Sequence, residues 1–252
     1  MRTERIDSIN KYIYAKKTVT LDQICEQFNI SKSTLRRDLN TILSDGNIHK
    51  IYGGVTALPQ QELISFHERN VNHLEEKKKI ALAAAQLVED GDIIFIDSGT
   101  TTVHIIDSLK WKKNITVITN SIPAVFSAIP CNNINVISLP GTLDRETLSL
   151  TDSYSARILS NFNISKAFMA ATGFSVNNGV TNSSPLETEI KRAVTERSQK
   201  VFLLADSSKC GVVALITYCS LNKIDALITD AQPTEDVCNF MKNNNRQIIL
   251  AT

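Results

Sequence analysis

The sequence has no long apolar stretch. No uninterrupted apolar run approaches the roughly 18 residues that a membrane-spanning helix needs. The first residues, MRTERIDSIN, carry charges where a secretory signal peptide has its apolar segment. These absences argue against a membrane-spanning or exported protein, and we expect the chain to lie in the cytoplasm.

Paired cysteines and clustered metal ligands are also missing. The five cysteines are scattered and include no C-x-x-C pair, which is typical of reduced intracellular thiols and not of a disulfide framework. The four histidines do not cluster, and HERNV has Val71 where a zinc-protease helix needs its second histidine. We therefore expect neither a metal site nor a bound cofactor.

What the chain has is length and an uneven distribution of charge. With 252 residues, 42% of them hydrophobic and 21% charged, it is long enough for two globular domains. Residues 1–56 hold nine Lys/Arg and six Asp/Glu, a net of +3, and the remainder holds 18 and 20, a net of −2. A basic module joined to a weakly acidic body indicates a polyanionic partner for the module.

The basic module begins with the patterns of two helices. Apolar residues recur at helical spacing within residues 3–16, at Ile6, Ile9 and Ile13. Thr20 is a good N-cap for a second helix, TLDQICEQF, because Gln23 follows three residues later and completes a capping-box pattern. The pair Asn-Ile at 29–30 then breaks this helix.

A third predicted helix has an apolar face and an opposite polar, basic face. Ser31 caps the segment SKSTLRRDLNTIL. Its apolar face consists of Leu35, Leu39 and Ile42. Polar side chains point away from that face, as a helix in a DNA major groove requires. A strand–turn–strand pattern at 46–56 predicts a small wing whose His49 and Lys50 approach phosphates. The predicted DNA contacts are Ser31, Ser33, Thr34, Arg36, Arg37, Asn40 and Lys50.

The order of these elements separates two interpretations of the Arg36–Arg37 pair. Two adjacent arginines are usually the solvated side of an ordinary helix, but here three helices, two caps and a wing follow one another. Residues 19–55 resemble the DeoR-type winged helix-turn-helix of bacterial repressors. The family's Ser-x-x-Thr-hydrophobic-Arg-Arg-Asp-Leu core is matched by residues 31–39, and the Gly-Gly of its wing by Gly53 and Gly54.

A polar stretch separates the module from the body. Residues 58–73, LPQQELISFHERNVNH, contain a proline and no sustained periodicity. We therefore predict a DNA-binding domain at 1–57, a linker at 58–73 and an effector-sensing α/β domain at 74–252. In the Ala-rich helix that opens this last domain, the Lys77–Lys79 run is interpreted as the solvated face and not as a second nucleic-acid contact.

The body alternates buried-type strands with helices. Apolar runs bounded by turn residues occur at DIIFID, ITVITNS, INVISLPGT, KAFMAATG, KVFLLADSSK, DALITD and QIILA, with a helix around 186–197 among them. This alternation predicts a mainly parallel α/β sheet covered on both faces. Ligands of such sheets bind beyond the carboxyl ends of the strands.

Small polar residues gather at these predicted strand ends. They form the segments DSGTT, TNS, PGTL, ATG and DSSK. Five such loops at one edge indicate a pocket for an oxygen-rich ligand. Gly99, in a turn that opens a helix, favours a phosphate there, and Lys209 adds a positive charge. Some of these Ser and Thr residues could instead simply cap helices.

The same loops resemble the sensor domain of the DeoR family, so the resemblance covers essentially the whole chain. The family's Asp-(Ser/Ala)-Gly-Thr-Thr, Thr-Asn-(Ser/Asn) and Asp-(Ser/His)-Ser-Lys motifs are matched at 97–101, 119–121 and 206–209, and its Glu-x-x-x-Lys-Arg helix at 187–192. The resemblance implies a fold related to ribose-5-phosphate isomerase and coenzyme A transferases. It also implies binding of phosphorylated sugars or their breakdown products.

The chain departs from the family pattern at three places, Pro140, 150–153 and Cys210, which puts the shape of the site in question. With Lys191 of the Glu-x-x-x-Lys-Arg helix as an inward charge partner, the predicted effector contacts are Asp97, Ser98, Gly99, Thr100, Thr101, Asn120, Ser121, Gly141, Thr172, Gly173, Lys191, Asp206, Ser208 and Lys209.

Three interpretations of the body differ in what it does with a ligand. An aldose isomerase needs a carboxylate placed as a base near the carbonyl carbon. Related isomerases carry it in the loop that corresponds to ATGFSVNNG, which has no carboxylate. A purely structural body would not need polar strand ends. We therefore predict that the chain is not an enzyme. We predict a homo-oligomeric repressor, a dimer or tetramer, that binds double-stranded operator DNA and is released by a phosphorylated sugar or sugar-acid effector.

The regulated operon is harder to predict. Segments such as IYGGVTAL, IFIDSGTTT and SLNKID most resemble repressors of myo-inositol catabolism, which respond to a phosphorylated deoxy-keto-gluconate intermediate. Repression of another sugar or polyol operon is the alternative.

Overall fold

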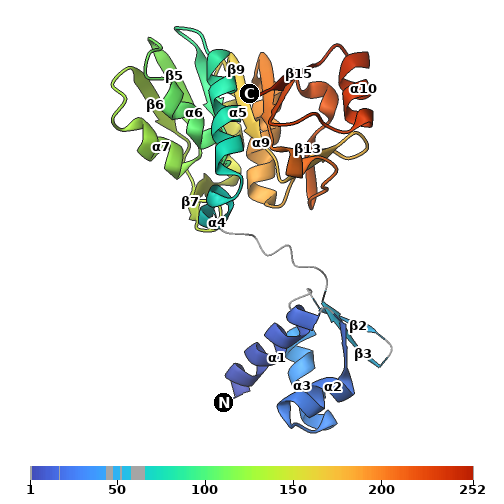
Figure 1. Cartoon of the computed structure of the whole chain (residues 1–252). Helices are drawn as coiled ribbons and strands as arrows, with labels where there is room; N and C mark the ends of the chain where they lie inside the picture. The colour runs from blue at the N-terminus through green and yellow to red at the C-terminus, as the bar shows by residue number, and fades with distance from the viewer. Residues whose placement is uncertain (1, 17, 44–47, 52, 58–65, 252) are drawn as a thin grey trace. The chain divides into compact units, whose positions relative to one another are not determined.

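The computed structural model describes residues 2–16, 18–43, 48–51, 53–57 and 66–251 (Figure 1). The chain divides into two compact units, Met1–Ile64 and Ser65–Thr252. Part of the predicted linker is helical, because residues 66–71 form α4 (Phe66–Val71) in the second unit, where the ring of Phe66 is buried. The rest of that segment, 58–65, lies outside the described residues.

The first unit is a winged helix-turn-helix. Its elements are α1 (Arg2–Lys16), β1 (Thr18–Thr20), α2 (Leu21–Phe28), α3 (Lys32–Leu43), β2 (Ile48–Ile51) and β3 (Gly54–Ala57). The three predicted helices and the two wing strands are confirmed. The additional strand β1 pairs antiparallel with β3, so the sheet has the order β1-β3-β2.

Local signals define the helix ends of this unit. The Thr20 side chain accepts from the Gln23 amide at 3.2 Å, and the Gln23 side chain accepts from the Thr20 amide at 2.9 Å, which is the predicted capping box. Asn29 adopts a left-handed conformation, φ 48°, and ends α2. The apolar faces of the three helices meet in one core that includes Ile9, Ile13, Ile24, Leu35, Leu39 and Ile42.

The second unit is built on a seven-stranded sheet in which every neighbouring pair is parallel. Its strands are β4 (Ile93–Ile96), β5 (Ile115–Thr119), β6 (Ile134–Ser138), β9 (Lys166–Ala170), β12 (Lys200–Leu204), β14 (Ala226–Thr229) and β15 (Gln247–Leu250). The order β15-β14-β12-β9-β4-β5-β6 confirms the predicted parallel α/β sheet. The order reverses between β4 and β9, which is where sheets of this kind bind ligands.

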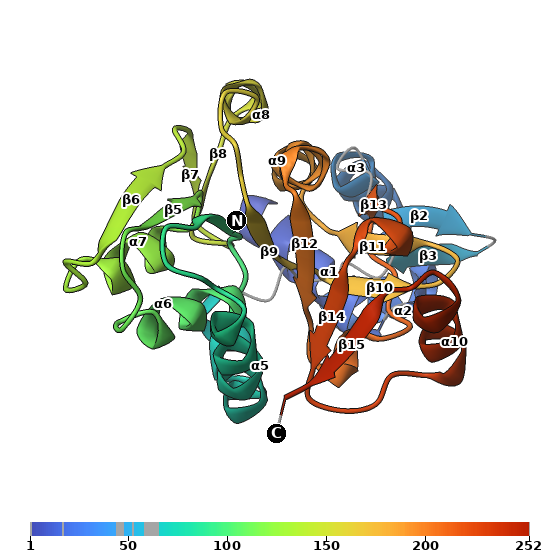
Figure 2. The same ribbon diagram turned by 90° about the horizontal axis from the view of Figure 1, so that it is seen from above.

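Helices cover both faces of this sheet, as Figure 2 shows. One face carries α5 (Leu74–Gln86), α6 (Ile105–Ser108) and α7 (Ile122–Ala128), and the other carries α8 (Ser153–Leu159), α9 (Pro185–Arg197) and α10 (Glu235–Asn243). Successive strand residues point to opposite cores: Ile94 and Ile96 pack with α5, and Phe95 packs on the side of α9. None of the helices in the described part of the chain combines the length and apolarity that crossing a bilayer requires.

Two small antiparallel sheets lie outside the main one and were not predicted. They are the hairpin β7 (Thr142–Asp144) with β8 (Ser149–Thr151), and the sheet of β10 (Gly173–Ser175), β11 (Gly179–Asn182) and β13 (Ile216–Cys219). Strands of three or four residues are too short to show a period of two in the sequence. Both sheets bring side chains to the candidate site.

Candidate functional site

The exposed side of α3 presents the side chains predicted to contact DNA. Arg36, Arg37 and Ser33 are exposed, and Lys50 is exposed on the wing strand β2. Ser31 has a second role, because its hydroxyl accepts from the Thr34 amide at 3.2 Å and so caps α3. The side chain of Asn40 lies outside the described residues, as does that of His49.

A partly buried ion pair holds α3 against α1. The Asp38 side chain is 1% exposed, and its two carboxylate oxygens accept from Arg5 Nε at 2.9 Å and from the other guanidinium nitrogen at 3.3 Å. Asp38, which belongs to the family core motif, therefore positions the helix and does not face outward toward DNA. The sequence contained no local signal for this pair, since the partners are 33 positions apart.

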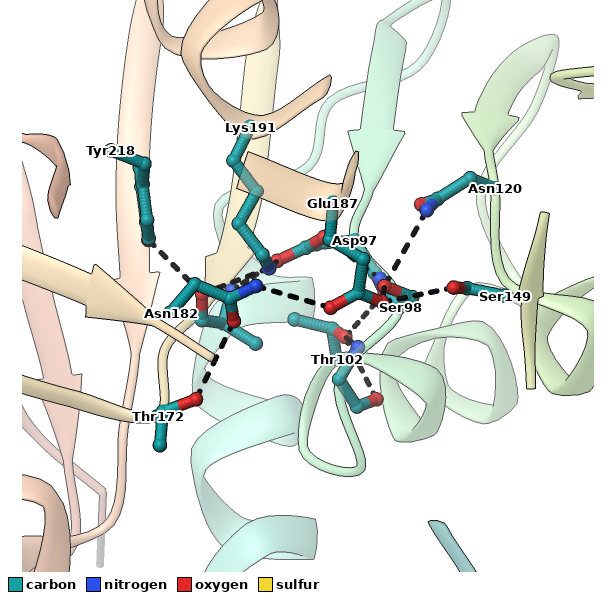
Figure 3. Close-up of polar contacts among 12 residues, drawn as sticks. Asp97, Ser98, Thr102, Asn120, Ser149, Thr172, Asn182, Glu187, Lys191 and Tyr218 are labelled. Carbon is teal, nitrogen blue, oxygen red and sulfur yellow. Dashed lines mark hydrogen bonds and ion pairs between the residues drawn. The ribbon is translucent and has the colours of Figure 1, made fainter. Parts of the chain in front are cut away.

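In the second unit, Asp97 joins the ends of β4 and β9 at the point where the strand order reverses (Figure 3). Its Oδ2 accepts from the Ala170 amide at 2.8 Å and from the ammonium group of Lys191. Lys191 also donates to the Ala170 carbonyl at 3.2 Å, as does the hydroxyl of Tyr218 at 3.0 Å. Asp97 and Lys191 were both predicted, and they form a buried ion pair.

Glu187 is the centre of a second buried network beside this pair (Figure 3). Its carboxylate accepts from Ser98 Oγ at 2.7 Å, Ser149 Oγ at 2.9 Å and Asn182 Nδ2 at 3.2 Å. Burial acts to raise the pKa of Glu187, but the charge of Lys191 and these hydrogen bonds outweigh it, so the pKa lies below its ordinary value. Glu187 therefore stays ionised in the folded unit.

Asn120 ends in an unsatisfied acceptor. Its side-chain Nδ2 donates to Ser98 Oγ at 3.5 Å, and Ser98 Oγ in turn donates to Glu187. The single hydroxyl hydrogen of Ser98 is donated to Glu187, so Ser98 Oγ can only accept from Asn120. The amide nitrogen of Asn120 therefore faces Ser98, because a reversed amide would place its oxygen against the Ser98 oxygen. Among the described residues, Asn120 Oδ1 is buried without a hydrogen-bond partner, which marks a position for an added donor.

The threonine loop, residues 97–101 after β4, packs tightly against β9. A Cβ on Gly99 would lie 2.2 Å from the Cβ of Ala170, so only glycine fits there. Thr102 Oγ1 accepts from the Gly99 amide at 3.1 Å and donates to the Asp97 carbonyl at 2.6 Å, which fixes the turn. Within the described residues, the amides of Thr100 and Thr101 donate no hydrogen bond to the protein, although both residues are buried.

Several other predicted effector contacts have local structural roles. Ser121 caps α7 by accepting from the Ala124 amide at 3.2 Å. Asp206 caps η2 (Ser207–Lys209) and accepts from the amide of Ser208 at 3.1 Å. Thr172 contacts Asn182 Oδ1 at 3.5 Å, at the margin of the Glu187 network. Gly141 and Gly173 lie where the backbones of Thr151 and Val212 leave no room for a Cβ.

The interpretation of Lys77 as part of a solvated face is wrong. Lys78 and Lys79 are exposed, but Lys77 is only 4% exposed and its ammonium group donates to the Arg69 carbonyl in α4. Burial lowers its pKa to about 8; Asp206 acts to raise it, and the positive charges of Lys209 and Arg69 lower it further. A run of three lysines in the sequence does not show which of them a neighbouring segment covers.

The two buried carboxylates qualify the sequence argument against catalysis. The loop 171–179 indeed contains no carboxylate, but Asp97 and Glu187 lie at the same edge of the sheet. Asp97 is paired with Lys191, and Glu187 accepts three side-chain hydrogen bonds, so neither is placed as a free base. Within the described ranges, no three potential ligands gather as a metal ion would need.

A winged helix-turn-helix unit followed by a parallel α/β unit with a buried polar network at its sheet edge is the architecture of a transcriptional regulator. The chain belongs to the DeoR family of such regulators. Residues 5–61 match the DeoR-like helix-turn-helix domain, and residues 72–231 match the DeoR C terminal sensor domain.

Named relatives span nearly the whole chain. The HTH-type transcriptional regulator IolR of Bacillus subtilis (strain 168) is 42% identical over 236 residues, which cover 94% of each chain. The HTH-type transcriptional repressor GlcR of the same strain is 31% identical and covers 98% of this chain and 95% of its own. The glycerol-3-phosphate regulon repressor of Escherichia coli (strain K12) is 27% identical and covers 99% of each. The chain is a DNA-binding transcriptional repressor of the DeoR type and not an enzyme.

The chain also matches solved structures of other proteins over part of its length. A D-ribose-5-phosphate isomerase in complex with phospho-erythronic acid is 21% identical, with a TM-score of 0.40, over 56% of this chain and 54% of its own. A 4-hydroxybutyrate CoA-transferase from Porphyromonas gingivalis is 12% identical, with a TM-score of 0.42, over 62% of this chain and 46% of its own. The matched region therefore spans about half of each of these proteins.

Proposed function

We propose that the chain represses a carbohydrate or polyol catabolic operon and is released from its operator by a phosphorylated sugar-type effector. The effector binds at the carboxyl edge of β4, β5 and β9, against the Asp97–Lys191 pair and the Glu187 network. Binding shifts the equilibrium between DNA-bound and free forms, which requires different effector affinities for the two. The effector leaves unaltered.

The observation that carries this proposal is the unsatisfied carbonyl of Asn120. A buried acceptor without a partner costs about 1–3 kcal/mol, which a hydroxyl group of a bound polyol would recover. Sugars and polyols offer such hydroxyls, whereas a body used only for oligomerisation gains nothing from an empty acceptor. Ser98 and Glu187, already joined to Asn120 by hydrogen bonds, complete a surface of acceptors and donors suited to neighbouring hydroxyls.

On the DNA side, we propose that α3 enters the major groove of the operator. Arg36 and Arg37 are exposed in the N-terminal half of α3, and neither forms an ion pair within the described residues. One guanidinium can read a base edge and the other can contact phosphate, with the exposed Ser33 on the same helix and Lys50 on the wing. Operators of such repressors have two or more half-sites, so we propose that the chain acts as a dimer or tetramer.

The effector we propose is a phosphorylated intermediate of myo-inositol catabolism. Support comes from the 42% identity with IolR over nearly the whole of both chains, together with the segments IYGGVTAL, IFIDSGTTT and SLNKID. A thermal-shift screen against phosphorylated sugars and sugar acids tests this choice. An inositol-derived sugar-acid phosphate should raise the unfolding temperature more than glucose 6-phosphate or glycerol 3-phosphate, and the reverse order would contradict it.

The site itself is tested with Asn120→Ala, and Asn135→Ala serves as the control because Asn135 is exposed on β6. In an operator-release titration, Asn120→Ala should need about tenfold more effector than the wild type, as the loss of one buried hydrogen bond predicts. Asn135→Ala should match the wild type. Equal release by all three proteins would contradict the placement of the effector.

The DNA-binding helix is tested with Arg37→Ala, and Lys200→Ala is the control because Lys200 is an exposed cation in the second unit. Arg37→Ala should abolish operator binding in a gel-shift titration and leave the effector-induced thermal shift unchanged, since the effector site lies in the other unit. Unchanged operator affinity of Arg37→Ala would contradict the recognition-helix assignment.

A further inference from the structure

The hairpin β7–β8 contacts the effector site through its second strand. The Asn120 carbonyl of the backbone accepts from the Leu150 amide of β8 at 2.8 Å. In the same strand, the hydroxyl of the fully buried Ser149 donates to the Glu187 carboxylate at 2.9 Å. Strand β8 is therefore bonded to both residues, Asn120 and Glu187, whose side chains are proposed to receive the hydroxyls of the effector.

The turn of the same hairpin holds the first residue of α4. The Glu146 carbonyl accepts from the Phe66 amide at 2.8 Å, and β7 and α4 lie at the same end of the second unit (Figure 1). Phe66 is the first described residue after the segment 58–65, in which the boundary between the two units falls. The Arg69 carbonyl, further along α4, accepts from the ammonium group of Lys77 in α5. A displacement of the turn therefore acts on a short helix that is otherwise anchored.

The turn between β7 and β8 has a fixed and strained conformation. Asp144 Oδ1 accepts from the amides of Glu146 at 2.9 Å and Thr147 at 3.2 Å. The hydroxyls of Thr147 and Ser149 are joined by a hydrogen bond of 2.8 Å. Between them, Leu148 has a left-handed backbone, φ 50°, which bulky residues rarely adopt. Such a conformation persists only where the surroundings impose it, so a change in the partners of Ser149 alters how firmly the turn is held.

We propose that the hairpin β7–β8 couples effector binding to the start of α4 and, through it, to operator release. The proposal rests on the proposed function and deepens it by naming the element that connects the two events. An effector hydroxyl at Asn120 or Glu187 competes with the hydrogen bond of Ser149 and so changes the balance between the strained turn and a relaxed one. The Glu146 carbonyl transmits this change to Phe66. The coupling requires that the effector binds one turn conformation more tightly than the other.

The test measures how strongly a bound effector changes the affinity of the protein for its operator. The probe is a phosphorylated deoxy-keto-gluconate, and fluorescence anisotropy of labelled operator DNA gives the operator Kd without the probe and at saturating probe. The ratio of the two Kd values is the coupling factor. Binding of the probe itself is followed separately by the shift in unfolding temperature.

The variants change the turn and leave the proposed effector contacts in place. Asp144→Ala removes the acceptor that fixes the turn, and Asp144→Asn is the matched control because it keeps an acceptor oxygen there. Thr147→Val removes the hydroxyl that is bonded to Ser149 and keeps nearly the same shape. Circular dichroism shows whether each variant folds, and Thr147→Val decides the test if Asp144→Ala does not fold.

The wild type and Asp144→Asn should have the same coupling factor, in the range of about 5–150-fold that is typical of allosteric proteins. In Asp144→Ala and Thr147→Val the factor should fall about threefold or more, as the loss of one hydrogen bond predicts. The probe should still raise the unfolding temperature of both variants as it does for the wild type. Loss of that shift together with the coupling would make the turn part of the binding site and contradict the proposal.

The same measurements separate this proposal from the proposed function. If the probe changes operator affinity by the same factor in the wild type and in both turn variants, the hairpin is not the connection and the effector function stands. If neither this probe nor any other phosphorylated sugar or sugar acid changes the operator affinity of the wild type, the proposed function fails, and the proposal fails with it.

Discussion

Replacing Gly99 tests whether the threonine loop and β9 form one packed unit. In Gly99→Ala, the new methyl group would lie 2.2 Å from the Cβ of Ala170 and 3.2 Å from Thr102 Oγ1. Ala170 Cβ cannot turn away, because it is attached directly to the strand backbone. The loop must therefore shift, which moves Asp97 and Ser98 and disturbs both hydrogen-bond networks of the site.

The expected cost is that of overpacking a core, about 1–3 kcal/mol. For a unit of this size each kcal/mol lowers the unfolding temperature by about 2–4 °C, so we expect a decrease of roughly 2 to 12 °C. Thermal unfolding followed by circular dichroism measures it. Operator binding should survive, since the DNA-binding unit has its own core, whereas release by the effector should be weakened.

A second substitution makes this prediction specific. Ala170→Gly removes the atom that the new methyl group meets and, by itself, destabilises a strand by roughly 0.5–1 kcal/mol. In Gly99→Ala/Ala170→Gly the clash is gone, so the double variant should be more stable than Gly99→Ala alone. If the two substitutions simply add their destabilisations, the close contact between the loop and β9 is not what requires glycine at 99.

Three further predictions concern the core, the carboxylate and the buried lysine. Leu35→Ala should cost about 2–5 kcal/mol in a small unit and so abolish operator binding, while the thermal transition of the second unit stays unchanged. The pKa of Glu187 lies below its ordinary value of 4.5, so its carboxylate stabilises the fold above that pH and this contribution disappears on acidification. The stability advantage of the wild type over Glu187→Gln in urea unfolding should therefore shrink from about pH 7 to about pH 3; a constant difference would contradict it. The pKa of Lys77, about 8, lies below its ordinary value of 10.5, so the unfolded chain holds this proton more tightly and stability should rise with pH between these values. Lys77→Met should lose that rise, whereas Lys79→Met should keep it.

Features that depend on local pattern could be predicted from the sequence. The face of α3 follows from the spacing of Leu35, Leu39 and Ile42, and its cap from Ser31. The strands of the large sheet follow from continuous apolar runs, because a strand buried on both faces needs them. The position of Asp97 at the carboxyl edge of the sheet also follows from the sequence, because it comes directly after the apolar run of β4.

Features that depend on contacts between distant segments could not be predicted in this way. Glu187 receives hydrogen bonds from Ser98 and Ser149, which lie 89 and 38 positions away in the chain. Lys77 is buried and its ammonium group donates to the Arg69 carbonyl of α4, and a run of three lysines does not show which of them makes such a contact. Ser121, predicted to contact the effector, also caps α7, a role that depends on where the helix begins.

The central claim is that a phosphorylated metabolite binds at the carboxyl edge of β4 and β9 and releases the operator without being transformed. It is tested most directly by titrating the protein on fluorescently labelled operator DNA with a phosphorylated sugar acid of inositol catabolism, followed by recovery of the metabolite. The predicted result is a fall in anisotropy as the DNA is released, with Asn120→Ala requiring more metabolite and the recovered compound unchanged. Operator binding that does not respond to the metabolite, or a metabolite recovered as a new product, would contradict the claim.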